Sequence, residues 1–269
     1  IGKLSICGTV NDLACMGAKP LYISCACVIE EGFPMDTLEE IVKSMAETAA
    51  KVGVQIVSGD TKVAGKGQVD GIFITTTGVG EIMPKAELSG AYARPGDAII
   101  VTGDVGRHGC TILLERDRYG MEAEVTSDCA PLWHPVRDLI QEIPEVHVIR
   151  DATRGGVGTV LYEIADESKV GIRLDAESVP VCDEVRGVTG MLGLEPLYLA
   201  CEGRLVIFVP KEKAEDAVRI LREASPDTAG ATIIGEVTDH MTGHVVMATE
   251  LGTETLLPPP SGELLPRIC

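Results

Sequence analysis

Residues 36–60 read DTLEEIVKSMAETAAKVGVQIVSGD, and this stretch decides the class of fold. Its apolar positions from Leu38 to Val52 recur at helical spacing, and Gly53 follows them as a natural helix C-cap. Residues 54–60 then read as a buried strand that ends in a polar loop. A helix followed at once by a strand predicts an α/β arrangement.

The segments on either side continue this alternation. A helix that ends at Gly17, a strand at 21–31 and a strand at 71–82 complete a β-α-β-β order with helices on one face of the sheet. After RPGDAII at 94–100 a second series begins. Its expected strands lie at 97–102, 146–149, 170–174, 204–209, 231–237 and 244–249, and its expected helices at 108–118, 134–142, 156–167, 182–192 and 211–224.

The sequence therefore predicts an α/β protein of the α+β type, built from two α/β domains and a tail. We expect an N-terminal domain at 1–93, a C-terminal domain at 94–257 and a flexible Pro-rich tail at 258–269. The apolar fraction of 45% is large enough for a substantial core. The chain opens without a methionine, within a helical pattern, so we expect a segment to precede it.

Charge and composition exclude several classes of partner. The formal net charge is −18 and aromatic residues make up 3%, which argues against nucleic acid and against an anionic membrane surface. The sequence has no signal peptide and no membrane-spanning apolar run, so we expect a cytoplasmic protein. The nine cysteines lack metal-finger spacing and read as reduced thiols.

Two Gly-containing segments follow predicted strands and could bind a phosphate and a metal. In the first, Gly59, Asp60, Thr61 and Lys62 offer backbone amides, a Mg²⁺ ligand and a positive charge. A polar loop at a strand end explains these residues equally well. In the second segment, a helix begins directly after the glycines, which directs backbone amides at an anion. Its candidate residues are Asp151, Thr153, Arg154, Gly155 and Gly156.

The alternative for the second segment is a Gly-rich turn with an Asp–Arg ion pair. Three further positions are candidates with structural alternatives of their own. Asn11 and Asp12 stand on a helix among apolar neighbours, where a carboxylate needs a partner or a metal, or where the two simply form a capped polar pair. His108 follows a strand and precedes a helix. Glu202 could be a general base, or an edge residue paired with Arg204.

Six segments together resemble the HypE family, the carbamoyl dehydratases of [NiFe]-hydrogenase maturation. They are GTVNDLACMGA (8–18), EEGF (30–33), SGDTKV (58–63), DATRGGVGTVLYEIA (151–165), ACEGRLV (200–206) and LPRIC (265–269). The family belongs to the ATP-binding superfamily that includes aminoimidazole ribonucleotide synthetase. The resemblance covers essentially the whole chain, and the ending PRIC is its most specific part.

The resemblance implies two α/β domains, a homodimer formed through the N-terminal domains, and ATP with Mg²⁺ bound between the domains. It implies that Cys269 receives a carbamoyl group from the carbamoyltransferase HypF and carries it as an S-carboxamide. ATP then drives dehydration of this group to a thiocyanate, and the cyanide passes to iron on the HypC–HypD complex. Asp12, Asp60 and Asp151 are the expected Mg²⁺ ligands, Lys62 and Arg154 the phosphate-binding cations, and Glu202 the base.

The chain departs from the family pattern at two places. The family's Gly-rich segment and Asp-Asp-Ala metal-binding motif are absent, and Arg107 stands where the family tends to have Asp before His-Gly. Two other functions remain open. One is another ATP-dependent enzyme of the superfamily, a thiamine-phosphate kinase or a ring-closing synthetase, and the other is a non-enzymatic thiol or metal carrier.

Overall fold

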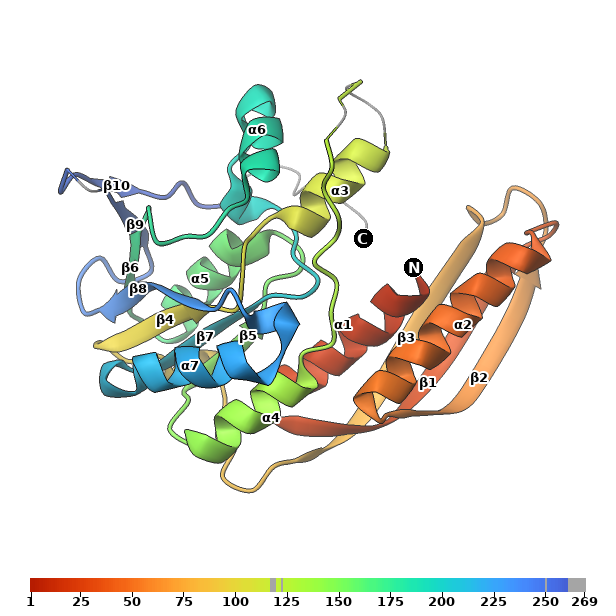
Figure 1. Cartoon of the computed structure of the whole chain (residues 1–269), viewed down its shortest axis with the longest axis horizontal. Coiled ribbons are helices and arrows are strands. Elements are labelled where there is room, and N and C mark those ends of the chain that lie inside the picture. Colours follow the sequence, from red (N-terminus) through yellow and green to blue (C-terminus); the bar gives the residue numbers. More distant parts are fainter. Residues whose placement is uncertain (117–119, 122, 250, 261–269) are drawn as a thin grey trace.

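The computed structural model describes residues 1–116, 120–121, 123–249 and 251–260. Two sheets organise this part of the chain (Figure 1). The smaller has the order β2-β1-β3 and the larger has the order β10-β9-β6-β8-β4-β7-β5. Within the described residues, no helix is both long and apolar enough to cross a bilayer.

The smaller sheet is built from strands β1 (Ala18–Glu30), β2 (Gln55–Ala64) and β3 (Ile72–Ile82). Helices α1 (Gly2–Cys15) and α2 (Met35–Val52) pack on one of its faces (Figure 1). Helix α2 ends as predicted, because Gly53 adopts the left-handed conformation with a φ of 81° and donates its N–H to the carbonyl of Ala49.

Two predictions about β2 were wrong. It was expected to be a buried strand that ends in a loop near residue 59, but it continues to Ala64 as an exposed edge strand. The residues from Gly59 to Lys62 therefore belong to the strand itself. Their backbone pairs in parallel with Cys25–Val28 of β1, and this ladder extends the strand through residues that read as a loop.

The larger sheet is covered on both faces (Figure 1). Helix α5 (Gly156–Glu167) packs on one face, while α4 (Trp133–Glu142) and α7 (Ala214–Ala224) pack on the other. The strands of the larger sheet are β4 (Asp97–Val101), β5 (Val148–Asp151), β6 (Gly171–Asp175), β7 (Leu205–Pro210), β8 (Thr232–Thr238), β9 (Val245–Ala248) and β10 (Glu254–Leu256). The predicted elements are present with small shifts of their ends, and β10 was not predicted.

The other α-helices of the described residues are α3 (Arg107–Glu115) and α6 (Asp183–Leu192), which pack on each other. Helix α1 joins the two parts of the molecule. One side of it packs on the smaller sheet and on α2, and another side contacts α4 and β5. Ile6, Val10 and Ala14 therefore lie in one core cluster with Leu132, Trp133 and Ile149. This double burial explains why α1 is apolar around much of its circumference.

Candidate functional site

Asp12 and Asp151 are brought together from distant positions in the sequence. Asp12 lies on α1 and Asp151 ends β5, and both line a pocket of about 240 Å³. Burial, together with the negative charge of Asp151, raises the pKa of Asp12 to about 6. The Thr153 hydroxyl donates a hydrogen bond of 3.0 Å to Asp151 Oδ2, and Arg150 lies 3.6 Å from Asp151 Oδ1. Two carboxylates that line one pocket are hard oxygen donors of the kind that a divalent cation takes.

Asp60 does not join this pair. Among the described residues there is no group of three or more His, Cys, Asp or Glu side chains arranged to hold a metal ion. Asp60 and Lys62 pair with Ala26 and Val28 of β1, and these residues alternate with Cys25, which packs into the core beneath the helices. Asp60 and Lys62 therefore lie on the sheet face that carries no helix. In contrast with the sequence prediction, one chain does not bring the three aspartates together.

The turn before α5 needs Gly155 and Gly156 for steric reasons, independently of any ligand. Both glycines have positive φ, 77° and 60°, immediately before or at the start of α5. A Cβ on Gly156 would lie 2.4 Å from the carbonyl oxygen of Leu199 and 2.5 Å from that of Leu197. Close backbone packing therefore requires this glycine. Arg154 is exposed at the same turn, where its guanidinium can meet an anion.

Asn11 is buried, and both ends of its amide are occupied. Its Nδ2 donates to the carbonyl oxygens of Ala130 and Glu202, at 3.0 and 3.4 Å. Its Oδ1 accepts a hydrogen bond of 2.8 Å from the backbone N–H of Leu132. Asn11 thus links α1 to the segment before α4 and to the residue that was predicted to be the base.

Glu202 is buried in the segment that leads into β7, next to residues that the sequence analysis missed. Its backbone N–H donates a hydrogen bond of 3.2 Å to Oδ1 of Asp128, which is itself buried. The negative charge of Glu202 also opposes ionisation of the thiols of Cys7 and Cys129, which are hydrogen-bonded to each other. Nothing in the sequence marks Asp128 as part of the site, because only the tertiary fold brings the 127–130 segment against residue 202.

His108 is also buried, on the first turn of α3. Its Nδ1 lies 2.8 Å from the Ser127 hydroxyl, and burial lowers its pKa. Arg107, which replaces the acidic residue expected before His-Gly, pairs with Asp104 at 3.6 Å and donates to the Thr126 hydroxyl. Cys269 lies outside the described residues. The chain that leads to it is fixed at its base, where the hydroxyls of Tyr162 and Tyr198 donate to the carbonyls of Leu257 and Pro258.

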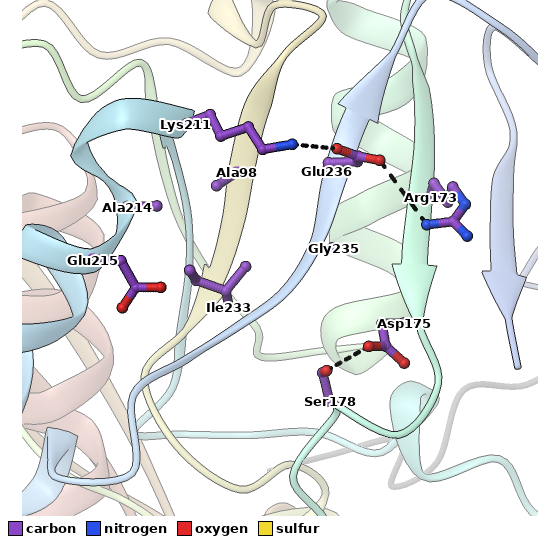
Figure 2. Close-up of a pocket in the computed structure, with 10 residues that line it drawn as sticks. All are labelled: Ala98, Arg173, Asp175, Ser178, Lys211, Ala214, Glu215, Ile233, Gly235 and Glu236. Atoms are coloured by element: carbon purple, nitrogen blue, oxygen red, sulfur yellow. Dashed lines mark hydrogen bonds and ion pairs between the residues drawn. The ribbon is translucent and has the colours of Figure 1, made fainter. Parts of the chain in front are cut away.

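A separate groove of about 350 Å³ lies between α7 and the strands β4, β6 and β8 (Figure 2). Figure 2 shows Glu236 between two cations, with Lys211 Nζ at 3.2 Å and Arg173 Nη1 at 3.9 Å. None of the predicted site residues lines this groove. Its polar side chains largely satisfy one another, so we assign no role in the reaction to it.

Comparison with known proteins places the chain in a family. Residues 1–82 match the N-terminal domain of the AIR synthase related proteins, and residues 94–247 match their C-terminal domain. The carbamoyl dehydratase HypE of Rhodobacter capsulatus is 46% identical over 269 residues, which is 100% of this chain and 79% of the relative.

Two crystal structures are similar along the chain. The hydrogenase maturation protein HypE in complex with ATP has a TM-score of 0.94 at 46% identity, covering 100% of this chain and 81% of that chain. The HypE–HypF complex matches with a TM-score of 0.93 at 43% identity, covering 96% of this chain and 84% of that chain. The chain therefore belongs to the HypE family of carbamoyl dehydratases, within the AIR synthase related proteins.

Proposed function

We propose that the protein is an ATP-dependent carbamoyl dehydratase that acts on an S-carboxamide carried by its own Cys269. The amide oxygen leaves with the γ-phosphoryl group of ATP, the nitrogen gives up both protons, and the sulfur keeps a nitrile carbon as thiocyanate. The observation that carries the proposal is the full-length similarity to HypE proteins, one of which is solved with ATP and another with HypF. The thiocyanate supplies cyanide for the iron of [NiFe]-hydrogenase.

The tail is long enough to reach Glu202 of its own chain. The nine residues 261–269 span at most about 30 Å. The start of the tail lies at Tyr198, because the Tyr198 hydroxyl donates to the carbonyl of Pro258. Tyr198 is four residues before Glu202, so the length of its side chain and of those four residues puts the start of the tail within about 25 Å of that glutamate. Glu202 would remove a proton from the carboxamide nitrogen, in a buried setting that suits a general base.

ATP and Mg²⁺ would bind where Asp12 and Asp151 converge. The two carboxylates are hard oxygen donors, and a divalent cation would offset both the burial and the repulsion by Asp151 that raise the pKa of Asp12. When bound, Mg²⁺ neutralises phosphate charge. We assign Arg154 and Lys62 to the phosphates, and the backbone of Gly59, Thr61, Gly155 and Gly156 to their close approach. Thr153 would orient the Asp151 carboxylate through its hydrogen bond, and Asn11 would hold the backbone of Glu202.

A homodimer would supply Asp60 and Lys62 from a second copy of the chain. They share the helix-free face of the smaller sheet with Tyr22, Phe73 and Val79, three residues that are 46–60% exposed. Such an apolar face favours burial against another copy. The change from the smaller to the larger sheet supports a boundary between 1–93 and 94–257, with 258–269 as the carrier tail. The carbamoyl donor would be HypF and the acceptor the HypC–HypD complex, in the cytoplasm.

Intact-mass measurement tests the dehydratase proposal. The full chain is carbamoylated on Cys269, mixed with ATP and Mg²⁺, and weighed at successive times. We expect the loss of one water from Cys269, with none in C269A, while the half-buried thiol variant C182A serves as the matched control and behaves like wild type. Turnover of ATP without this loss would point to another kinase or synthetase activity of the superfamily.

A further inference from the structure

Two tyrosine hydroxyls hold the backbone at the point where the Pro-rich tail begins. Tyr162, on α5, donates to the carbonyl of Leu257, and Tyr198 donates to the carbonyl of Pro258. The Leu257 N–H donates to the carbonyl of Val245 at 2.9 Å, and Leu257 is 2% exposed within the same core cluster as α5. The root of the tail, Leu257 and Pro258, is therefore held by groups from three other parts of the fold.

Both tyrosines can donate these hydrogen bonds because burial keeps their hydroxyls protonated. Burial raises the pKa of Tyr162, and it raises the pKa of Tyr198 to about 12. An unperturbed tyrosine has a pKa of about 10, so both rings keep their hydroxyl hydrogen throughout the physiological range. The carbonyls of the root can only accept, which fixes the direction of both hydrogen bonds.

Three consecutive prolines pass this restraint along the chain. Pro258, Pro259 and Pro260 have no N–H, so the carbonyl is the backbone group by which a hydrogen bond can hold each of them. Their rings also fix φ at about −65°. A hydrogen bond that fixes Pro258 therefore limits the directions in which the chain can continue through Pro260.

Tyr198 connects the root of the tail to the turn that we assign to the phosphates. Tyr198 ends the short helix η2 (Pro196–Tyr198), and its ring packs on Gly158 in the first turn of α5. A Cβ on Gly158 would lie 2.6 Å from Tyr198 Cε1. The carbonyls of Leu197 and Leu199, on either side of Tyr198, lie against Gly156 with no room for a side chain. One segment thus packs on the glycine turn and holds the root of the tail.

We propose that Tyr162 and Tyr198 are positioning residues for the carrier cysteine, which hold the root of the tail beside the glycine turn so that Cys269 starts close to the candidate site. The inference rests on the proposed function, because it requires Cys269 to carry the reacting group. Neither tyrosine touches the reacting atoms. Each acts through the backbone, by setting where the carrier segment begins and which way it leaves.

The size of the effect follows from the length of chain that the hydroxyls take out of play. If the root came loose back to the end of β9 at Ala248, residues 249–269 instead of 259–269 would separate Cys269 from the last held residue. This length is about twice as great, and the effective concentration of the thiol falls as about the −3/2 power of length. The loss should therefore be about threefold, and larger where the direction set by the prolines matters.

A comparison of a tethered with a detached carrier tests this role. The double variant Y162F/Y198F keeps both rings and removes only the donors, so it should dehydrate the group on its own Cys269 about three- to tenfold more slowly in single turnover. The same substitutions are then made in C269A chains, and the carbamoylated peptide SGELLPRIC (residues 261–269) is supplied below saturation. A detached peptide gains nothing from the root, so its rate should be unchanged. Y92F, at a tyrosine that is 48% exposed, is the matched control for both reactions.

An undiminished tethered rate in the double variant would overturn the inference. Equal losses with the tethered and the detached carrier would also overturn it, because the tyrosines would then act on the site or on the fold. Hydrogen–deuterium exchange of the full chain gives a readout without activity. The Leu257 amide should exchange about tenfold faster in the double variant, and unchanged protection would refute the restraint. If wild type itself loses no water, the dehydratase proposal fails, whereas the exchange measurement still decides whether the hydroxyls hold the root.

Discussion

Strands β2 and β7 both contain apolar runs, yet the structure treats them in opposite ways. β7 is the sixth strand of the larger sheet and is buried along nearly its whole length, because helices cover both faces. β2 is the edge of the smaller sheet and is exposed along nearly its whole length. An apolar run therefore indicates that a strand needs cover, without indicating whether the cover comes from the same chain.

The difference bears directly on the predicted site. The residues on or next to the larger sheet, such as Asp151 and Glu202, are held by contacts within the chain. Asp60 and Lys62 on β2 face away from the helices, and we propose that they complete the site of a second copy. Four predictions test this contrast.

The two phenylalanines Phe208 and Phe73 give the largest contrast in stability. Phe208 in β7 is 0% exposed, and F208A should lower the free energy of unfolding by about 3–5 kcal/mol. Phe73 in β3 is 51% exposed, so F73A should have little effect in dilute solution and a larger one as the dimer forms. Denaturant unfolding at several protein concentrations measures both. A concentration-independent cost of F73A would contradict the proposed interface.

Mixing two inactive variants tests whether Lys62 acts across the dimer. K62A and E202Q should each lower the single-turnover rate by about a hundredfold or more. After subunit exchange, mixed dimers contain one site with both wild-type residues, so about a quarter of wild-type activity should return. Each variant carried alone through the exchange is the control. If the mixture stays as inactive as its components, Lys62 serves its own chain.

Asn11 joins α1, beside the smaller sheet, to the segments that flank the larger sheet. Removing its side chain should therefore destabilise the protein even when no ligand is bound. N11A leaves the N–H of Leu132 and the carbonyls of Ala130 and Glu202 without their buried partner. We expect a loss of about 2–3 kcal/mol in the free energy of unfolding, because buried unsatisfied backbone groups are costly. Thermal melts of the nucleotide-free protein provide the measurement. An unchanged melting temperature would show that these bonds do not stabilise the junction.

Asp12 should give the smallest effect, and its sign depends on pH. Its pKa is raised to about 6 in the folded protein from an ordinary value of 3.8, so the folded state holds more protons than the unfolded state between these values. Stability relative to D12N should therefore fall as pH rises through this window. Without Mg²⁺, D12N should melt higher than wild type at pH 8, and the two should converge near pH 4. The opposite order at pH 8 would refute the destabilisation of the Asp12 carboxylate by burial and by Asp151.

Much of the fold was predictable because its signals are local. Helix α2 follows from apolar spacing and from the cap at Gly53, and the start of α5 follows from Gly155 and Gly156. The resemblance of six short segments also predicted the family correctly. The loop expected at Gly59–Lys62 was wrong because polar side chains alone do not end a strand whose backbone continues to pair with a neighbour.

The candidate site divides along the same line. The sequence by itself determined which residues carry suitable chemistry, including Asp12, Asp151, Glu202 and the Cys269 thiol, because residue type and spacing are properties of the chain. Only the tertiary structure decided that Asp12 and Asp151 line one pocket, that Asp60 does not join them, and that Asp128 and Asn11 hold the Glu202 backbone. Those contacts join residues far apart in sequence, and their geometry is set by the packing of α1 between the two sheets.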